Sequence, residues 1–239
     1  MQSPLDVYEI LALLYFLLVW GIFARYAKRR AKTGELASLS RSLCDQRIAW
    51  AHRLLTRDMR MTDASLLASQ ERVVGFFAST TLLLLAGVLT ALTSSSQIAE
   101  ISSHIPFAER QTSGQIEAKL ALIMLILIYA FFKVTWSLRQ YGFAAVVMGA
   151  APGPDEEVTA QERDTFARNF AKLMDTAGHD NNSGLRAYYF CLSVVCWLSG
   201  TLPFLVATTL TVFVLYNREF KSTVVESIKS SYVKIPGRD

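Results

Sequence analysis

Charged side chains are scarce in this chain of 239 residues, because Asp, Glu, Lys and Arg together make up only 18% of it. A soluble domain carries roughly a quarter of such residues. Hydrophobic residues instead make up 52%, the mean hydropathy is +0.29, and the apolar residues gather in long runs separated by polar stretches. This distribution argues against a soluble globular enzyme and indicates a protein that folds in a lipid bilayer.

Cysteine and histidine are also scarce, with three residues of each. So few ligands leave little material for a disulfide framework, a metal site or a pair of haem ligands. The sequence lacks the G-x-G-x-x-G, Walker A, H-E-x-x-H and G-x-S-x-G motifs, and the stretch 180–184 misses the register of a calcium loop and is expected to form a turn. We therefore expect no enzyme, no metal and no cofactor.

Four apolar runs are long enough for membrane-spanning helices, since a hydrocarbon core of about 30 Å needs about 20 helical residues. The predicted spans are residues 7–26, 73–92, 119–138 and 187–216. The fourth would be about 45 Å long as one straight helix, and Ser199, Gly200 and Pro203 in its middle can kink it or turn a hairpin. Because each half is short for a crossing, we expect one kinked helix and four spans, with five passes if the run is a hairpin.

The basic residues predict an orientation for these spans. Lys and Arg number 11 in residues 24–72, one in 94–118 and five in 137–186. By the positive-inside rule, segments 27–72 and 139–186 are cytoplasmic, and the loop 93–118 and the N-terminus lie outside. Four spans would also place the polar tail, residues 217–239, outside, although its basic residues favour the cytoplasm. The expected fold class is an all-α integral membrane protein, with residues 1–239 forming a single membrane domain.

The cytoplasmic segments carry amphipathic helical patterns. Apolar residues recur at helical spacing from Ile48 to Leu55 with arginines between them, which predicts a helix that packs on its own bundle or lies on anionic headgroups. Thr62 or Asp63 can cap the next helix. A further amphipathic pattern runs from Phe166 to Met174, and Gly178 is expected to end it. We therefore expect a cytoplasmic layer of helices.

Three stretches carry a family resemblance. They are MTDASLLASQERVVGFFASTTLLLL (61–85), IYAFFKVTWSLRQYGFAAVVMGAAP (128–152) and residues 183–220, which begin near GLRAYYF and end with LYNREF. Together they resemble the bacterial domain of unknown function 599 family. The resemblance implies an uncharacterised multi-pass protein of the bacterial inner (plasma) membrane, and it transfers no activity, cofactor or site residue.

Lys133 is the sharpest candidate for a functional residue. If the third span begins near Lys119, Lys133 lies about 21 Å into it and roughly 9 Å from the cytoplasmic boundary. A charge in hydrocarbon costs about 2.5 to 3.5 kcal/mol. Lys133 therefore snorkels to the headgroups, pairs with a carboxylate or with helix carbonyls, or contacts an anionic solute; Arg139 and Gln140 are the neighbouring candidates for such a contact.

Hydroxyl and aromatic side chains complete the set of candidates. Ser79, Thr80, Thr81, Thr208 and Thr209 bring hydroxyls into apolar runs, where they either bond helices together or line a path. Interfacial anchors are expected at Trp136, Arg186, Tyr188 and Tyr189.

Two functions fit these features. The first is a non-catalytic accessory or scaffold subunit that docks onto a larger membrane assembly. The alternative is a homo-oligomeric channel or transporter for a small, anionic solute, lined by Lys133, Arg139 and the hydroxyls. The expected partners are a bilayer with anionic headgroups and other membrane subunits or further copies of the chain, but not nucleic acid.

Overall fold

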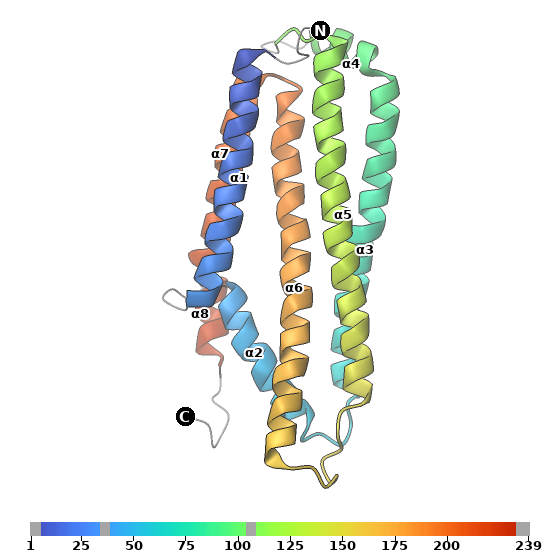
Figure 1. Cartoon of the computed structure of the whole chain (residues 1–239), viewed down its shortest axis with the longest axis vertical. Coiled ribbons are helices and arrows are strands. Elements are labelled where there is room, and N and C mark those ends of the chain that lie inside the picture. Colours follow the sequence, from blue (N-terminus) through green and yellow to red (C-terminus); the bar gives the residue numbers. More distant parts are fainter. Residues whose placement is uncertain (1–5, 34–38, 104–108, 233–239) are drawn as a thin grey trace. The chain divides into compact units, whose positions relative to one another are not determined.

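The computed structural model describes residues 6–33, 39–103 and 109–232, and every regular element in these ranges is an α-helix (Figure 1). The helices are α1 (Val7–Thr33), α2 (Leu39–Leu54), α3 (Met61–Thr93), α4 (Ser95–Ser103), α5 (Ser113–Gly149), α6 (Ala160–Trp197), α7 (Thr201–Phe220) and α8 (Thr223–Ser230). The all-α prediction is confirmed for this part of the chain. Parts of the predicted cytoplasmic segment, outer loop and tail, residues 34–38, 104–108 and 233–239, lie outside it.

Three of the helices are long and apolar enough to cross a membrane. These segments are Val7–Ala27, Met61–Thr93 and Ser113–Gly149. Large apolar side chains point outward from them, among them Leu18, Leu83 and Phe132, which are 60%, 74% and 66% exposed. Such exposure is unfavourable in water and is the expected state of a helix surface in lipid.

The described helices contribute to two compact units. The first comprises Met1–Lys28, Ser79–Phe132 and Ser183–Asn217, and the second comprises Arg29–Ala78, Lys133–Asn182 and Arg218–Asp239. In the first unit, Phe16 of α1 lies fully buried with its ring centroid 5.8 Å from that of Phe190 on α6 and 5.3 Å from that of Phe204 on α7. Interlocked aromatic rings of this kind hold α1, α6 and α7 together.

In the second unit, the amphipathic helix α2 packs on its own chain. Trp50 of α2 lies edge to face with Phe170 of α6 at a centroid distance of 5.8 Å, and its Nε1 donates to Asp63 of α3 at 2.6 Å. Arg47 of α2 pairs with Asp175 of α6 at 2.6 Å. Of the two interpretations of this helix, the contacts favour packing within the bundle. The structure begins α3 at Met61, so Asp63 lies in its first turn instead of at its cap.

The run 187–216 is two helices, so the prediction of one kinked helix was wrong. Trp197 ends α6 and Thr201 begins α7, with Gly200 between them at a φ of 147°, a conformation that side chains rarely adopt. The two helices run back along each other, because the hydroxyls of Ser193 and Thr211 lie 2.9 Å apart (Figure 1). Pro203 is tolerated because it falls in the first turn of α7, where backbone N–H groups have no partner within the helix.

Helix α6 also passes through two predicted breaks, at Gly178 and at residues 180–184. Gly178 does not end a helix. It lies where a Cβ would come within 2.5 Å of the Arg47 guanidinium, so the close approach of α2 accounts for the glycine. Asp180 belongs to the helix and points toward α5, where it accepts two hydrogen bonds. Tertiary contacts thus override the local turn signals.

The described part of the tail, residues 218–232, packs with α2 in the second unit (Figure 1). Ser40 donates to the Glu219 carboxylate at 2.8 Å, and Gln46 donates to the backbone oxygen of Ile228 at 3.0 Å. The four-span prediction placed the tail and segment 27–72 on opposite faces of the membrane. In the structure, described residues of these two segments are instead in contact with each other.

Candidate functional site

Lys133 is paired with a carboxylate within the chain. Its Nζ lies 2.8 Å from Oδ1 of Asp180, and the side chains of Lys133 and Asp180 are 35% and 15% exposed. Gln140 donates to the other oxygen of Asp180 at 2.7 Å. Lys133, Ser137 and Gln140 lie at i, i+4 and i+7 and therefore share one face of α5. The sequence left snorkelling, pairing with a carboxylate and contact with an anionic solute open for Lys133, and this geometry matches pairing with a carboxylate.

The same face of α5 makes a further contact with α6. The fully buried Ser137 hydroxyl donates to the backbone oxygen of Ala177 at 2.7 Å. Arg139 does not join this set, because it is exposed and its guanidinium lies 5.7 Å from the centroid of the Phe143 ring. Lys133 and Gln140 thus share Asp180 as their partner. Arg139 lies on another face of α5.

The predicted hydroxyl groups fall into two classes. Thr208 and Thr209 donate to the backbone oxygens of Phe204 and Leu205 one turn earlier, at 2.8 and 2.9 Å. Thr81 is fully buried and shares a hydrogen bond with the Tyr188 hydroxyl, joining α3 to α6. The side chain of Ser79 is exposed, and that of Thr80 is partly buried. Bonds within and between helices are what the helix-stabilising interpretation of these residues requires.

The predicted interfacial anchors make varied contacts. Trp136 is 50% exposed on α5. The Arg186 guanidinium lies 5.7 Å from the ring centroid of the buried Phe23, and Tyr189 packs against the aromatic core of the first unit. Their anchoring role stays a prediction.

Sequence reasoning missed a second charged cluster, in the first unit. Lys119 of α5 is fully buried and lies 2.7 Å from Oε1 of Glu9 on α1. Lys119 also donates to Gln111 at 2.8 Å, and Gln115 donates to Glu9 at 3.0 Å. The Lys119 ammonium lies 5.1 Å from the ring centroid of Trp197, in cation–π geometry. One feature of the sequence could have pointed to this cluster. Glu9 is a charged residue among the apolar residues Val7, Tyr8 and Ile10, so it needs a partner if that helix is buried.

A polar pocket of about 500 Å³ adjoins this cluster. Its lining residues are Asp6, Tyr8, Glu9, Glu109, Gln111, Gln115, Thr201, Leu202 and Leu205. Glu109 accepts hydrogen bonds from the backbone nitrogen and the hydroxyl of Thr201 at 3.1 and 3.2 Å, which places a carboxylate at the N-terminus of α7. Negative charge is favourable at this end of a helix.

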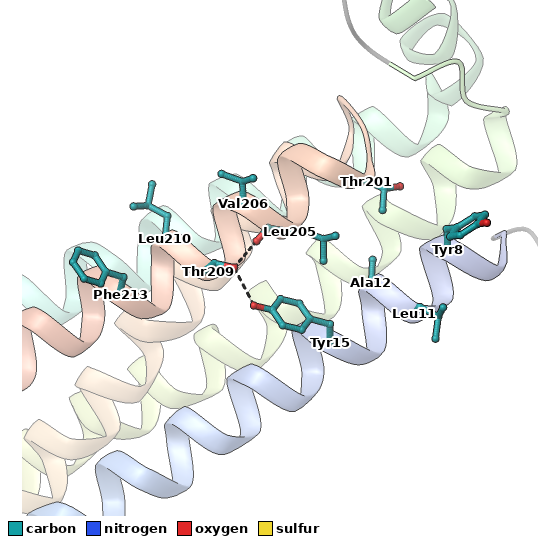
Figure 2. Close-up of a pocket in the computed structure, with 10 residues that line it drawn as sticks. All are labelled: Tyr8, Leu11, Ala12, Tyr15, Thr201, Leu205, Val206, Thr209, Leu210 and Phe213. Carbon is teal, nitrogen blue, oxygen red and sulfur yellow. Dashed lines mark hydrogen bonds between the residues drawn. The ribbon is translucent and has the colours of Figure 1, made fainter.

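An apolar groove of about 860 Å³ runs between α1 and α7 (Figure 2). The α1 side chains that line it are Tyr8, Leu11, Ala12 and Tyr15, and the α7 side chains are Thr201, Leu205, Val206, Thr209, Leu210 and Phe213. The hydroxyls of Tyr15 and Thr209 lie 2.9 Å apart and bridge the two helices. The groove and the polar pocket are two hollows of the first unit that are large enough for a ligand.

The Cys44 thiol of the second unit lies in an environment that keeps it protonated. Burial raises the pKa of the Cys44 thiol, and the nearby Asp175 carboxylate adds to the rise. A thiol that stays protonated is a poor nucleophile and metal ligand. Within the described ranges of either unit, no three His, Cys, Asp or Glu side chains are grouped to hold a metal ion.

Comparison with known proteins places the chain in a family. No curated protein and no solved structure matches it. The family described as "Protein of unknown function, DUF599" matches residues 11–224. Because the match covers most of the sequence and includes all three resembling stretches, the chain belongs to the DUF599 family.

Proposed function

We propose that this protein is a non-catalytic subunit of the bacterial inner membrane that crosses the bilayer five times and serves as an accessory or scaffold for a larger membrane assembly. The turn at Gly200 and the packing of the tail on α2 support five crossings. At 20 residues, α7 would be about 30 Å long, which matches a hydrocarbon core. An outer N-terminus and five crossings put the tail in the cytoplasm, in agreement with its basic residues.

Exposed apolar side chains near the start of α3 carry the docking proposal. Met59, Met61 and Leu66 are 72%, 74% and 54% exposed. Helix α3 has 33 residues and would be about 50 Å long, whereas its apolar run begins only at Val73. Its first dozen or so residues therefore project beyond a bilayer of about 30 Å. Apolar side chains exposed to water at that position indicate an interaction site for the cytoplasmic face of another membrane subunit.

The two lysines of α5 support a structural role over an anion path. Lys119 pairs with Glu9 and Lys133 pairs with Asp180, each within hydrogen-bond distance. A paired lysine presents little net charge to a passing anion, and a channel would require free positive charge along its wall. The lysines of this helix are instead placed to hold it against its neighbours.

Native mass measurement after purification in mild detergent tests the proposal. We expect a foreign membrane subunit to co-purify in fixed stoichiometry with the wild-type chain and to be lost from the variant Met61→Gln/Leu66→Gln. The control Ser65→Gln changes an exposed neighbour without removing apolar surface and should retain the partner. A closed homo-oligomer that conducts anions, or a partner that survives the double substitution, would overturn the docking proposal.

A further inference from the structure

The apolar groove and the polar pocket of the first unit meet. They share three lining residues, Tyr8, Thr201 and Leu205. The groove extends along α1 and α7 from this junction, and the pocket lies beside the first turns of both helices. Together they form one hollow with an apolar limb and a carboxylate-lined end.

We propose that this hollow binds one membrane phospholipid whose headgroup ends in a primary ammonium, with an acyl chain in the groove and the ammonium in the pocket. This lipid site goes beyond the docking role and involves other residues.

The length of the groove fits an acyl chain better than a partner helix. On α7 its lining residues run from Thr201 to Phe213, which is about 18 Å along the axis. One leaflet of the hydrocarbon core is about 15 Å deep, whereas a transmembrane helix needs about 30 Å. The groove's volume of about 860 Å³ lies within the range of roughly 300 to 1,000 Å³ typical of small-molecule sites.

The wall of the groove presents hydrocarbon despite its hydroxyl groups. Thr209 donates its single hydroxyl hydrogen to the backbone oxygen of Leu205 at 2.9 Å. The Tyr15 hydroxyl must then be the donor in its 2.9 Å bond to Thr209. Both hydrogens are thus used inside the protein (Figure 2), and Leu11, Leu205 and Leu210 supply the surface for an alkyl chain.

The pocket carries more negative than positive charge. Lys119 compensates Glu9, and the carboxylates of Asp6 and Glu109 add two further negative charges. A primary ammonium donates three hydrogen bonds to carboxylate and amide oxygens, whereas a quaternary ammonium has no hydrogen to donate. Tyr8 is 80% exposed and lines both limbs, so its hydroxyl is placed to donate to the phosphate between the ammonium and the acyl chain.

Lipid retention by the purified full chain tests the proposal. The protein in detergent is incubated with phosphatidylethanolamine, phosphatidylglycerol or phosphatidylcholine of identical acyl chains, and bound lipid is counted by native mass spectrometry. We expect phosphatidylethanolamine to be retained about three- to tenfold better than the other two, the range expected for two partly exposed charge contacts. Asp6→Asn keeps the backbone bonds of Asp6 and should lower that preference.

A second pair of variants tests the groove. Val206 is 60% exposed, so Val206→Trp should fill the groove without disturbing the core and should reduce retention of all three lipids. Leu192 on α6 is 61% exposed and lies outside the groove, so Leu192→Trp should retain lipid like the wild type. Equal retention of the three lipids, equal behaviour of the two tryptophan variants, or a lipid-free dimer held through the groove would overturn the proposal.

Discussion

Lys119 of α5 and Glu9 of α1 form an ion pair of 2.7 Å whose side chains expose only 0% and 6% of their surface. Removing two charges from water costs several kcal/mol each, and only good geometry with further hydrogen bonds offsets that cost. Gln111, Gln115 and the Trp197 ring supply those contacts. The pair fixes which residues of α1 and α5 face each other within the first unit.

Breaking this pair from one side should destabilise the protein strongly. Lys119→Met leaves the Glu9 carboxylate buried without its cation, and we expect the free energy of unfolding to fall by about 3 to 5 kcal/mol. The measurement is denaturant unfolding of the purified protein in detergent. The double variant Glu9→Gln/Lys119→Met removes both charges and should recover part of the loss.

The exposed Lys172 provides the control, since Lys172→Met should change stability by no more than about 0.5 kcal/mol. A Lys119→Met variant as stable as this control would show that the pair does not hold α1 to α5.

Lys133→Met should have a smaller effect, because its partner Asp180 keeps a hydrogen bond from Gln140 and both side chains are partly exposed. We expect a loss of about 1.5 to 3 kcal/mol, the usual contribution of a hydrogen bond to a charged group. The neighbouring Arg139→Met should cost less, since Arg139 is exposed. Anion flux in reconstituted vesicles should be the same in wild type and both variants, and a flux that Lys133→Met abolishes would revive the channel hypothesis.

The topology predicts where labels and reporters act. A reporter fused after Asp239 should be active in the cytoplasm, because the tail packs on α2. Cysteines placed at residues 94–96 should react with an impermeant reagent from outside, and cysteines at residues 33–40 only after permeabilisation. A reporter active outside together with the same labelling pattern would indicate an even number of crossings and contradict the proposed hairpin.

The hydrophobic runs predicted α1, α3 and α5 well, because about twenty predominantly apolar residues in a row leave few alternatives to a membrane helix. Local turn signals predicted α6 badly, since Gly178 and Asp180 are accommodated by contacts with Arg47 and Lys133, which lie far away in the sequence. The partners in the ion pairs Lys119–Glu9 and Lys133–Asp180 are also far apart in the sequence, so the sequence did not predict either pair. The sequence identifies Lys133 as a charge within an apolar run, but nothing near it in the sequence points to Asp180, and the span boundaries predict Lys119 at the edge of the membrane.

The N-terminus of α6 carries a pH-dependent contact. The backbone nitrogen and the hydroxyl of Thr159 donate to the Glu162 carboxylate at 2.8 and 2.7 Å, and the Glu162 nitrogen donates back to the Thr159 hydroxyl at 3.2 Å. This reciprocal arrangement is a capping box. The hydrogen bond from the Thr159 side chain lowers the pKa of Glu162 most, and the hydrogen bond from the Thr159 backbone lowers it further.

The sign of the pH effect follows from that direction. Because the folded protein binds the Glu162 proton less tightly than the unfolded chain, the contact stabilises the start of α6 above the unfolded pKa of about 4.3 and is lost as pH falls through the lower folded value. Amide hydrogen exchange in the first turn of α6 should therefore stay slow from neutral pH down to about 4.3 and accelerate, after correction for the intrinsic rate, as pH falls further through the lower folded pKa of Glu162. Glu162→Gln keeps the capping geometry without the titration and should remove this pH dependence, whereas Glu162→Ala should show fast exchange at every pH. A pH dependence that persists in Glu162→Gln would mean that another carboxylate at this end of the helix is responsible.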